Sequence, residues 1–173
     1  MNMADLVKNL QLTYVLPTQA VAREPKPQKV ALIAHLYYMD LLEPTLAYAR
    51  SMPEGTDFIL TVGSQEKVEL VEEACKDLPY NVTVRLIENR GRDVSALLVG
   101  CKDIVSDYDL VCFIHDKKVT QLSPYTVGEG FARKCFDNLL PTREFVENVI
   151  STFDSEPRLG LLSPTPPNHA DYF

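Results

Sequence analysis

Four short apolar runs divide the chain, and polar turns follow each of them. The runs cover residues 30–34, 56–62, 82–87 and 110–114, and three stretches with helical spacing separate them. Apolar runs of this length are typical of strands, and their alternation with helices of 10 to 15 residues predicts a parallel sheet with right-handed crossovers. We therefore expect an α/β fold over residues 29–115, with a mostly parallel sheet and helices on both faces.

The three helical stretches each offer one apolar stripe to the sheet. Helix 40–50 has Leu42, Leu46 and Ala49, and the next helix begins after Ser64, a predicted N-cap. The inner faces of the second and third helices are predicted from spacing as Val68, Val71, Cys75 and Leu78, then Val94, Leu97, Leu98, Cys101 and Val105.

The remaining parts of the chain are less regular. Residues 1–28 are predicted to hold a short helix (1–16) and a proline-containing linker (17–28), so the α/β domain proper is expected to be 29–173. After a loop at 119–128, helices are expected at 129–139 and after Pro141, with Thr142 as N-cap. Phe145, Val149 and Phe153 should face inward in the second of these, and residues 159–163 read as one more strand.

Composition narrows the class of protein. The 173 residues are 46% hydrophobic with a net charge of −7, which is typical of a globular chain and argues against a general nucleic-acid binder. The four cysteines form no Cys-x-x-Cys pair and are predicted to be buried free thiols. No apolar run reaches membrane-spanning length and no signal peptide is evident, so a cytoplasmic location is expected.

The turn after the third run has the sequence Glu-Asn-Arg-Gly-Arg-Asp, at residues 88–93. Arg90 and Arg92 could bind phosphate oxygens in pairs, Gly91 would allow a sharp turn, and the start of the following helix would add a positive field. A diphosphate would suit this place. In the alternative reading, Asp93 caps the helix and the arginines are solvated.

Two more strand ends offer chemistry. After the fourth run the chain reads His115-Asp116-Lys117-Lys118, which supplies a titratable ring, one carboxylate and two cations, or else an ordinary charged turn. After the first run, His35, Tyr37 and Tyr38 could stack on a base or sugar, or fill the core. One carboxylate is a poor cage for a metal, so a divalent cation at Asp116 is not expected.

These segments together resemble a known family. The combination of His35-Leu36-Tyr37-Tyr38, Asn89-Arg90-Gly91-Arg92-Asp93 and His115-x-Lys117-Lys118 is similar to the rhamnan synthesis F proteins, bacterial glycosyltransferases of rhamnose-containing surface polysaccharides. The resemblance runs from about residue 30 to residue 164. It implies a Rossmann-like, GT-A-like half that binds a nucleoside-diphosphate sugar, with dTDP-rhamnose as a suitable donor.

The resemblance also implies site residues and partners. The substrate-binding set would be His35, Tyr37, Asn89, Arg90, Arg92, Asp93, His115, Asp116, Lys117 and Lys118, with no catalytic base assigned. The expected partners are a nucleotide-sugar donor, a glycan or lipid-linked glycan acceptor at the inner face of the membrane, and the rest of a larger glycosyltransferase. A non-catalytic binding or regulatory module with the same fold is the alternative.

Overall fold

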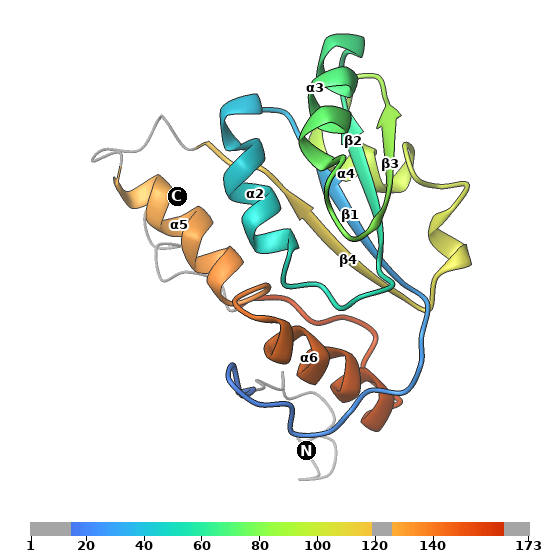
Figure 1. The fold of residues 1–173 in the computed structure, drawn as a ribbon, viewed down its shortest axis with the longest axis vertical. Coiled ribbons are helices and arrows are strands. Elements are labelled where there is room, and N and C mark those ends of the chain that lie inside the picture. Colours follow the sequence, from blue (N-terminus) through green and yellow to red (C-terminus); the bar gives the residue numbers. More distant parts are fainter. Residues whose placement is uncertain (1–14, 119–125, 165–173) are drawn as a thin grey trace, which may run out of the picture.

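The computed structural model describes residues 15–118 and 126–164, with backbone alone for 126–129. Its centre is a four-stranded, all-parallel sheet in the order β3-β2-β1-β4 (Figure 1). The strands are β1 (Val30–His35), β2 (Asp57–Val62), β3 (Asn81–Leu86) and β4 (Leu110–His115). The predicted α/β fold with a parallel sheet is thus confirmed, and each strand begins and ends within one residue of its predicted range.

Helices cover both faces of this sheet. In chain order they are η1 (Met39–Leu41), α2 (Leu42–Ala49), α3 (Gln65–Cys75), α4 (Arg92–Leu98), η2 (Val105–Asp107), α5 (Thr126–Asp137) and α6 (Arg143–Ser155). The first strand, which is buried along its whole length, sends alternate side chains to opposite faces. Leu32 and Ala34 join a large core with α2, α3 and the C-terminal helices, and Ala31 and Ile33 join a smaller core under the α4–η2 region.

The α4 region differs from its prediction. Val94 and Leu98 were expected to be buried, but their side chains are 57% and 62% exposed, and the buried residues are Ala96 and Cys101. The helix ends at Leu98 and the chain turns through Gly100, where an added Cβ would lie 2.7 Å from the Ala96 carbonyl oxygen. The helical phase is therefore interrupted. Of the predicted inner face, Leu97, Cys101 and Val105 pack in the smaller core as expected, whereas Val94 and Leu98 do not.

The C-terminal helices match their predictions only in part. Thr142 is the N-cap of α6 and accepts a hydrogen bond from the Phe145 amide, as predicted (3.2 Å). The buried face of α6 carries Val146 and Ile150, however, while the predicted face is half-buried. No strand forms at 159–163, where Leu161 is 81% exposed, because an apolar run becomes a strand only where a neighbour completes its hydrogen bonds.

Residues 17–28 run along α6 without forming a helix or strand (Figure 1). The buried side chain of Asn148 accepts from the Ala22 amide (2.8 Å) and donates to the carbonyls of Pro17 (3.0 Å) and Ala20 (2.9 Å). Asp154 accepts from the Lys26 amide (2.7 Å). This proline-containing segment is therefore fastened to the helix by its backbone. The helix predicted at 1–16 lies almost wholly outside the described residues.

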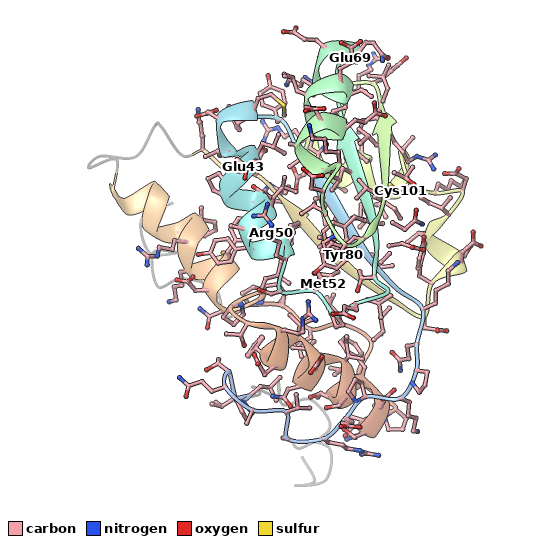
Figure 2. The ribbon with its side chains drawn as sticks, in the orientation of Figure 1. Glu43, Arg50, Met52, Glu69, Tyr80 and Cys101 are labelled. Carbon is pink, nitrogen blue, oxygen red and sulfur yellow. The ribbon has the colours of Figure 1, made fainter. Side chains whose placement is uncertain are left out.

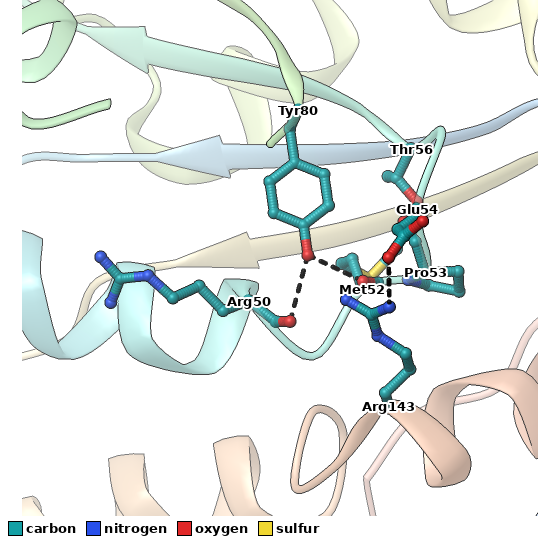
Figure 3. Close-up of polar contacts among 7 residues, drawn as sticks. All are labelled: Arg50, Met52, Pro53, Glu54, Thr56, Tyr80 and Arg143. Carbon is teal, nitrogen blue, oxygen red and sulfur yellow. Dashed lines mark hydrogen bonds and ion pairs between the residues drawn. The ribbon is translucent and has the colours of Figure 1, made fainter. Parts of the chain in front are cut away.

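A cluster around Tyr80 joins the amino-terminal end of the sheet to α2. The Tyr80 ring stacks on Phe58, with centroids 4.0 Å apart, and its hydroxyl donates to the carbonyls of Met52 (2.8 Å) and Arg50 (3.1 Å). Figure 2 shows Tyr80 and Met52 beneath α2, and Figure 3 shows the two hydrogen bonds in close-up. These contacts lie at the opposite end of the strands from the turns that carry the candidate chemistry.

Candidate functional site

The carboxyl ends of the four strands place the predicted segments along one edge of the sheet. The chain adds β2 and then β3 on one side of β1, and β4 on the other, so the strand order reverses between β1 and β4. In open α/β sheets, ligands bind outside the carboxyl ends of the strands at such a reversal. His35 and His115 are the last residues of these two strands and are paired in register.

Strand alternation explains which side chains meet there. His35, Thr61 and His115 occupy the same face as Ile33, Ile59 and Phe113, the face that α4 covers. Asp93, in the first turn of α4, reaches this face, and its carboxylate lies 3.5 Å from His115 Nε2. The other ring nitrogen of His115, Nδ1, lies 2.9 Å from the Asp116 carbonyl oxygen. With protons on both nitrogens, the ring donates to both acceptors.

His35 is the buried member of this group. Its Nδ1 is 3.0 Å from the Thr61 hydroxyl, and its side chain is 6% exposed. Burial lowers the pKa of His35 below its usual value, and the neighbouring charges of His115 and Lys67 act in the same direction, while Asp93 opposes them. The neutral ring is therefore favoured, and a buried neutral histidine can accept or donate one proton at Nε2.

Asp116 points to the opposite face from His115 and has a different role from the one its sequence neighbours indicate. It is 5% exposed, and its Oδ2 accepts the backbone amides of Tyr37 (2.8 Å) and Tyr38 (2.5 Å). Burial raises the pKa of Asp116, against the effect of these two hydrogen bonds. The carboxylate thus fixes the turn after β1. In the described part of the chain, no three His, Cys, Asp or Glu side chains are grouped to hold a metal.

Two lysines lie over the tyrosines of that turn. Lys67, in the first turn of α3, lies over the Tyr37 ring at 4.6 Å and donates to the Tyr37 carbonyl (2.6 Å). Lys118 lies over the Tyr38 ring at 5.0 Å and pairs with Asp40. Lys67 was not among the predicted site residues. Its place three residues into the helix that follows the Gly63-Ser64 turn, at a strand's carboxyl end, was the available signal.

The loop between β3 and α4 presents Arg90 and Arg92 at the rim. Gly91 has φ +80°, which confirms the predicted sharp turn, and Arg92 also lies in the left-handed region with φ +57°. Both arginines are exposed, and neither they nor Lys117 make a side-chain hydrogen bond or ion pair within the described residues. Asn89 is also exposed and lies beside Gly63, where an added Cβ would be 3.5 Å from the Asn89 Cβ.

The start of α4 lacks the predicted cap. Asp93 makes no capping hydrogen bond, since the N-cap position belongs to Gly91, which has no side chain. The helix has seven residues, and the positive field expected from its first turn stays a prediction.

The predicted residues thus fall into three groups. The structure brings His35, Asp93 and His115 together, and it links Tyr37 to Asp116 through the backbone. Asn89, Arg90, Arg92 and Lys117 stand at the rim, while Lys118 turns toward η1. The turns at 35–40, 61–67, 88–93 and 115–118 carry five Lys or Arg and five Asp or Glu, in a chain with 17 and 24. This edge is therefore less acidic than the chain as a whole.

Comparison with known proteins bears on identity. No curated protein and no solved structure matches the chain. Among the described residues, no helix is long and apolar enough to cross a membrane. The family model of Rhamnan synthesis protein F matches residues 1–173, the whole length. The chain, with its arginine-bearing loop and histidine-lysine strand end, therefore belongs to the rhamnan synthesis protein F family, whose role is in making rhamnose polysaccharide.

Proposed function

We propose that the carboxyl edge of this sheet binds the diphosphate of a nucleotide-activated sugar, with dTDP-rhamnose as the donor, for transfer in rhamnan synthesis. The observation that carries the proposal is the exposed pair Arg90 and Arg92, whose side chains have no hydrogen-bond or ion-pair partner among the described residues and stand beside the strand reversal. Guanidinium groups bind phosphate oxygens with two hydrogen bonds each. In a chain of net charge −7, exposed cations without an ion-pair partner among the described residues favour an anionic ligand at this edge.

Cations, rather than a metal ion, would neutralise the diphosphate in this proposal. Asp116 is the carboxylate at the end of β4, but its Oδ2 already accepts hydrogen bonds from two backbone amides. Lys117 is exposed next to it, and Lys67 lies on the neighbouring helix. These side chains supply the charge that a diphosphate leaving group needs.

The acceptor would be a glycan or lipid-linked glycan, presented to this edge at the inner face of the membrane, with the remainder of a larger transferase. A cytoplasmic setting agrees with the four free cysteines. Burial raises the pKa of Cys75 to about 11, which keeps this thiol protonated and unreactive.

Calorimetric titration with dTDP and dTDP-rhamnose tests the proposal. We expect dissociation constants of about 10 μM to 1 mM, or roughly −4 to −7 kcal/mol. Arg90→Ala and Arg92→Ala should each weaken binding by about 1.5–3 kcal/mol, the range for charged hydrogen bonds. Arg133→Ala is the matched control, because that exposed arginine of α5 pairs with Asp137.

Two outcomes would contradict the proposal: a parent protein that binds neither ligand, or arginine variants that bind as tightly as the parent. Binding should also persist in EDTA. A strict requirement for Mg²⁺ or Mn²⁺, lost in Asp116→Asn, would restore a metal role. A transfer assay of the full-length protein with labelled donor then separates an enzyme from a binding module with the same fold.

A further inference from the structure

The backbone of the arginine loop is held in a conformation that its sequence does not favour. Gly91 adopts a left-handed φ without cost, but Arg92 is the one non-glycine residue with positive φ in the described part of the chain. An L-residue in that region clashes with its own backbone. Such a residue persists where the surrounding structure fixes it, and these residues concentrate at functional sites.

The side chain of Ser95, one turn into α4, supplies that fixation. Its hydroxyl oxygen lies within hydrogen-bonding distance of two carbonyl oxygens, those of Arg90 and Arg92 (3.0 Å for the second). The hydroxyl has one proton, so the two carbonyls share it. The two acceptors flank Gly91, and the Ser95 amide also donates to the Gly91 carbonyl (3.3 Å). One residue thus contacts the backbone of all three loop positions.

Gly91 and Ser95 fit each other closely. A Cβ added at Gly91 would lie 2.8 Å from the Ser95 Cβ and 3.1 Å from its hydroxyl oxygen. Any side chain at position 91 would therefore displace Ser95 as well as strain the turn. The glycine makes room for the serine, and the serine holds the carbonyls on both sides of the glycine.

We propose that Ser95 is a positioning residue that presents Arg90 and Arg92 to the diphosphate, with no contact of its own to the ligand. This inference rests on the proposed function. Arg90 and Arg92 are the two ends of a three-residue turn whose backbone is already fixed. Binding one ligand with both side chains therefore costs less backbone conformational entropy. Without the hydroxyl, Arg92 can relax toward a right-handed conformation, and the spacing of the two side chains changes.

The first test needs no ligand. In the unliganded protein, Ser95→Ala should shift the NMR amide signals of residues 90–93. It should also speed hydrogen exchange by about tenfold or more at the amides of residues 90 and 95, which donate to the Glu88 (2.8 Å) and Gly91 (3.3 Å) carbonyls. Ser155→Ala is the matched control, because the Ser155 hydroxyl also contacts two carbonyls, those of Ser151 (2.9 Å) and Thr152 (3.1 Å), but on α6. It should leave the loop signals unchanged. If Ser95→Ala leaves them unchanged too, the positioning role is wrong.

The second test measures binding of dTDP in a double-mutant cycle. Ser95→Ala should weaken binding about three- to tenfold in the parent and have little effect in Arg90→Ala/Arg92→Ala, because the serine acts through those arginines. An equal loss in both backgrounds would overturn the proposal and indicate a general loss of structure. The two proposals can fail separately. If Ser95→Ala changes the loop signals but the parent binds no dTDP, the proposed function is wrong, and Ser95 is shown to fix the loop backbone without a role in binding.

Discussion

At the scale of single residues, the carboxyl edge contains side chains whose hydrogen bonds are complete and others whose bonding groups face solvent. Asp116 and His35 are buried and bonded, whereas Arg90 and Arg92 are exposed and unpaired among the described residues. The first kind contributes to stability and the second is available for a ligand. Substitutions of the buried residues should therefore change the free energy of unfolding, and substitutions of the exposed arginines should change ligand binding.

Asp116 is expected to matter for folding. Asp116→Ala leaves the Tyr37 and Tyr38 amides without an acceptor and should lower the free energy of unfolding by about 2–6 kcal/mol, at about 1–3 kcal/mol for each unsatisfied group. Asp116→Asn can keep one oxygen in the same place, so its loss should be smaller, about 1 kcal/mol. Urea unfolding of the three proteins measures both values. Equal losses in the two variants would contradict this role.

His35 should make stability depend on pH. Its folded pKa lies below the ordinary value of 6.5, so the unfolded chain binds the proton first as pH falls, and stability decreases from about pH 6.5 downward. One such group contributes a slope of at most about 1.4 kcal/mol per pH unit. The charged neighbours Asp93, His115 and Lys67 remain in His35→Gln, which should therefore show a flatter profile between pH 7 and 5 in urea unfolding. An unchanged slope in the variant would mean that other groups cause it.

The sequence predicted where these residues lie better than what they do. Strand ends located His35 and His115 at one edge, and residue types indicated charge. The orientation of Asp116 was not predicted, because adjacent residues at a strand end point to opposite faces and a backbone partner has no sequence signature. Lys67 was missed for a related reason: it comes from a helix start, three residues beyond the Gly63-Ser64 turn.

At the scale of elements, the pattern of the sequence was most informative for the strands. All four were predicted within one residue, the buried β1 and β2 and the more exposed β3 and β4 alike, because short apolar or alternating runs between polar turns leave little choice. Periodicity was right only in part where it depended on an unbroken helix, as at α4, and it was wrong where an apolar run had no strand to pair with, as at 159–163. In both places tertiary contacts decide the structure, and the periodicity of the sequence carries no information about those contacts.

The link between α2 and the sheet can be tested at Tyr80. Tyr80→Phe removes the hydroxyl that bonds the Arg50 and Met52 carbonyls (Figure 3) and should lower the free energy of unfolding by about 0.5–1.5 kcal/mol. Tyr80→Leu also loses the stack on Phe58 and should cost more. Chemical denaturation measures both. If Phe costs as much as Leu, the hydroxyl rather than the ring carries the contact.

At the scale of the whole molecule, one buried polar side chain joins segments that lie far apart in sequence. Asn148 is 1% exposed and bonds three backbone groups of residues 17–22 across separations of 126 to 131 residues. The proline-containing segment was predicted as a linker from its composition. Its attachment to α6 was not predictable, because backbone acceptors carry no sequence signal.

Loss of this attachment should expose the segment to protease. Asn148→Ala leaves the Ala22 amide without its acceptor and the Pro17 and Ala20 carbonyls without their donor, and should lower the free energy of unfolding by about 2–4 kcal/mol. Trypsin should then cut after Arg23 faster than in the parent, since released backbone is the preferred substrate. Asn138→Ala is the control, because the side chain of Asn138, directly after α5, bonds only the Lys134 carbonyl of that helix among the described residues. Equal cutting rates for parent and Asn148→Ala would contradict the attachment.

The bond between the early segment and α6 also sets an order of events during synthesis. The ribosome delivers residues 17–28 long before Asn148, and at about 5–20 residues per second the interval is several seconds or more. Over that time the strands and helices between residue 28 and α6 can assemble, while residues 17–28 have no helix to bind. Docking on α6 is then a late event that closes a completed domain, and a chain stalled before residue 148 would carry a finished sheet with a loose leading segment.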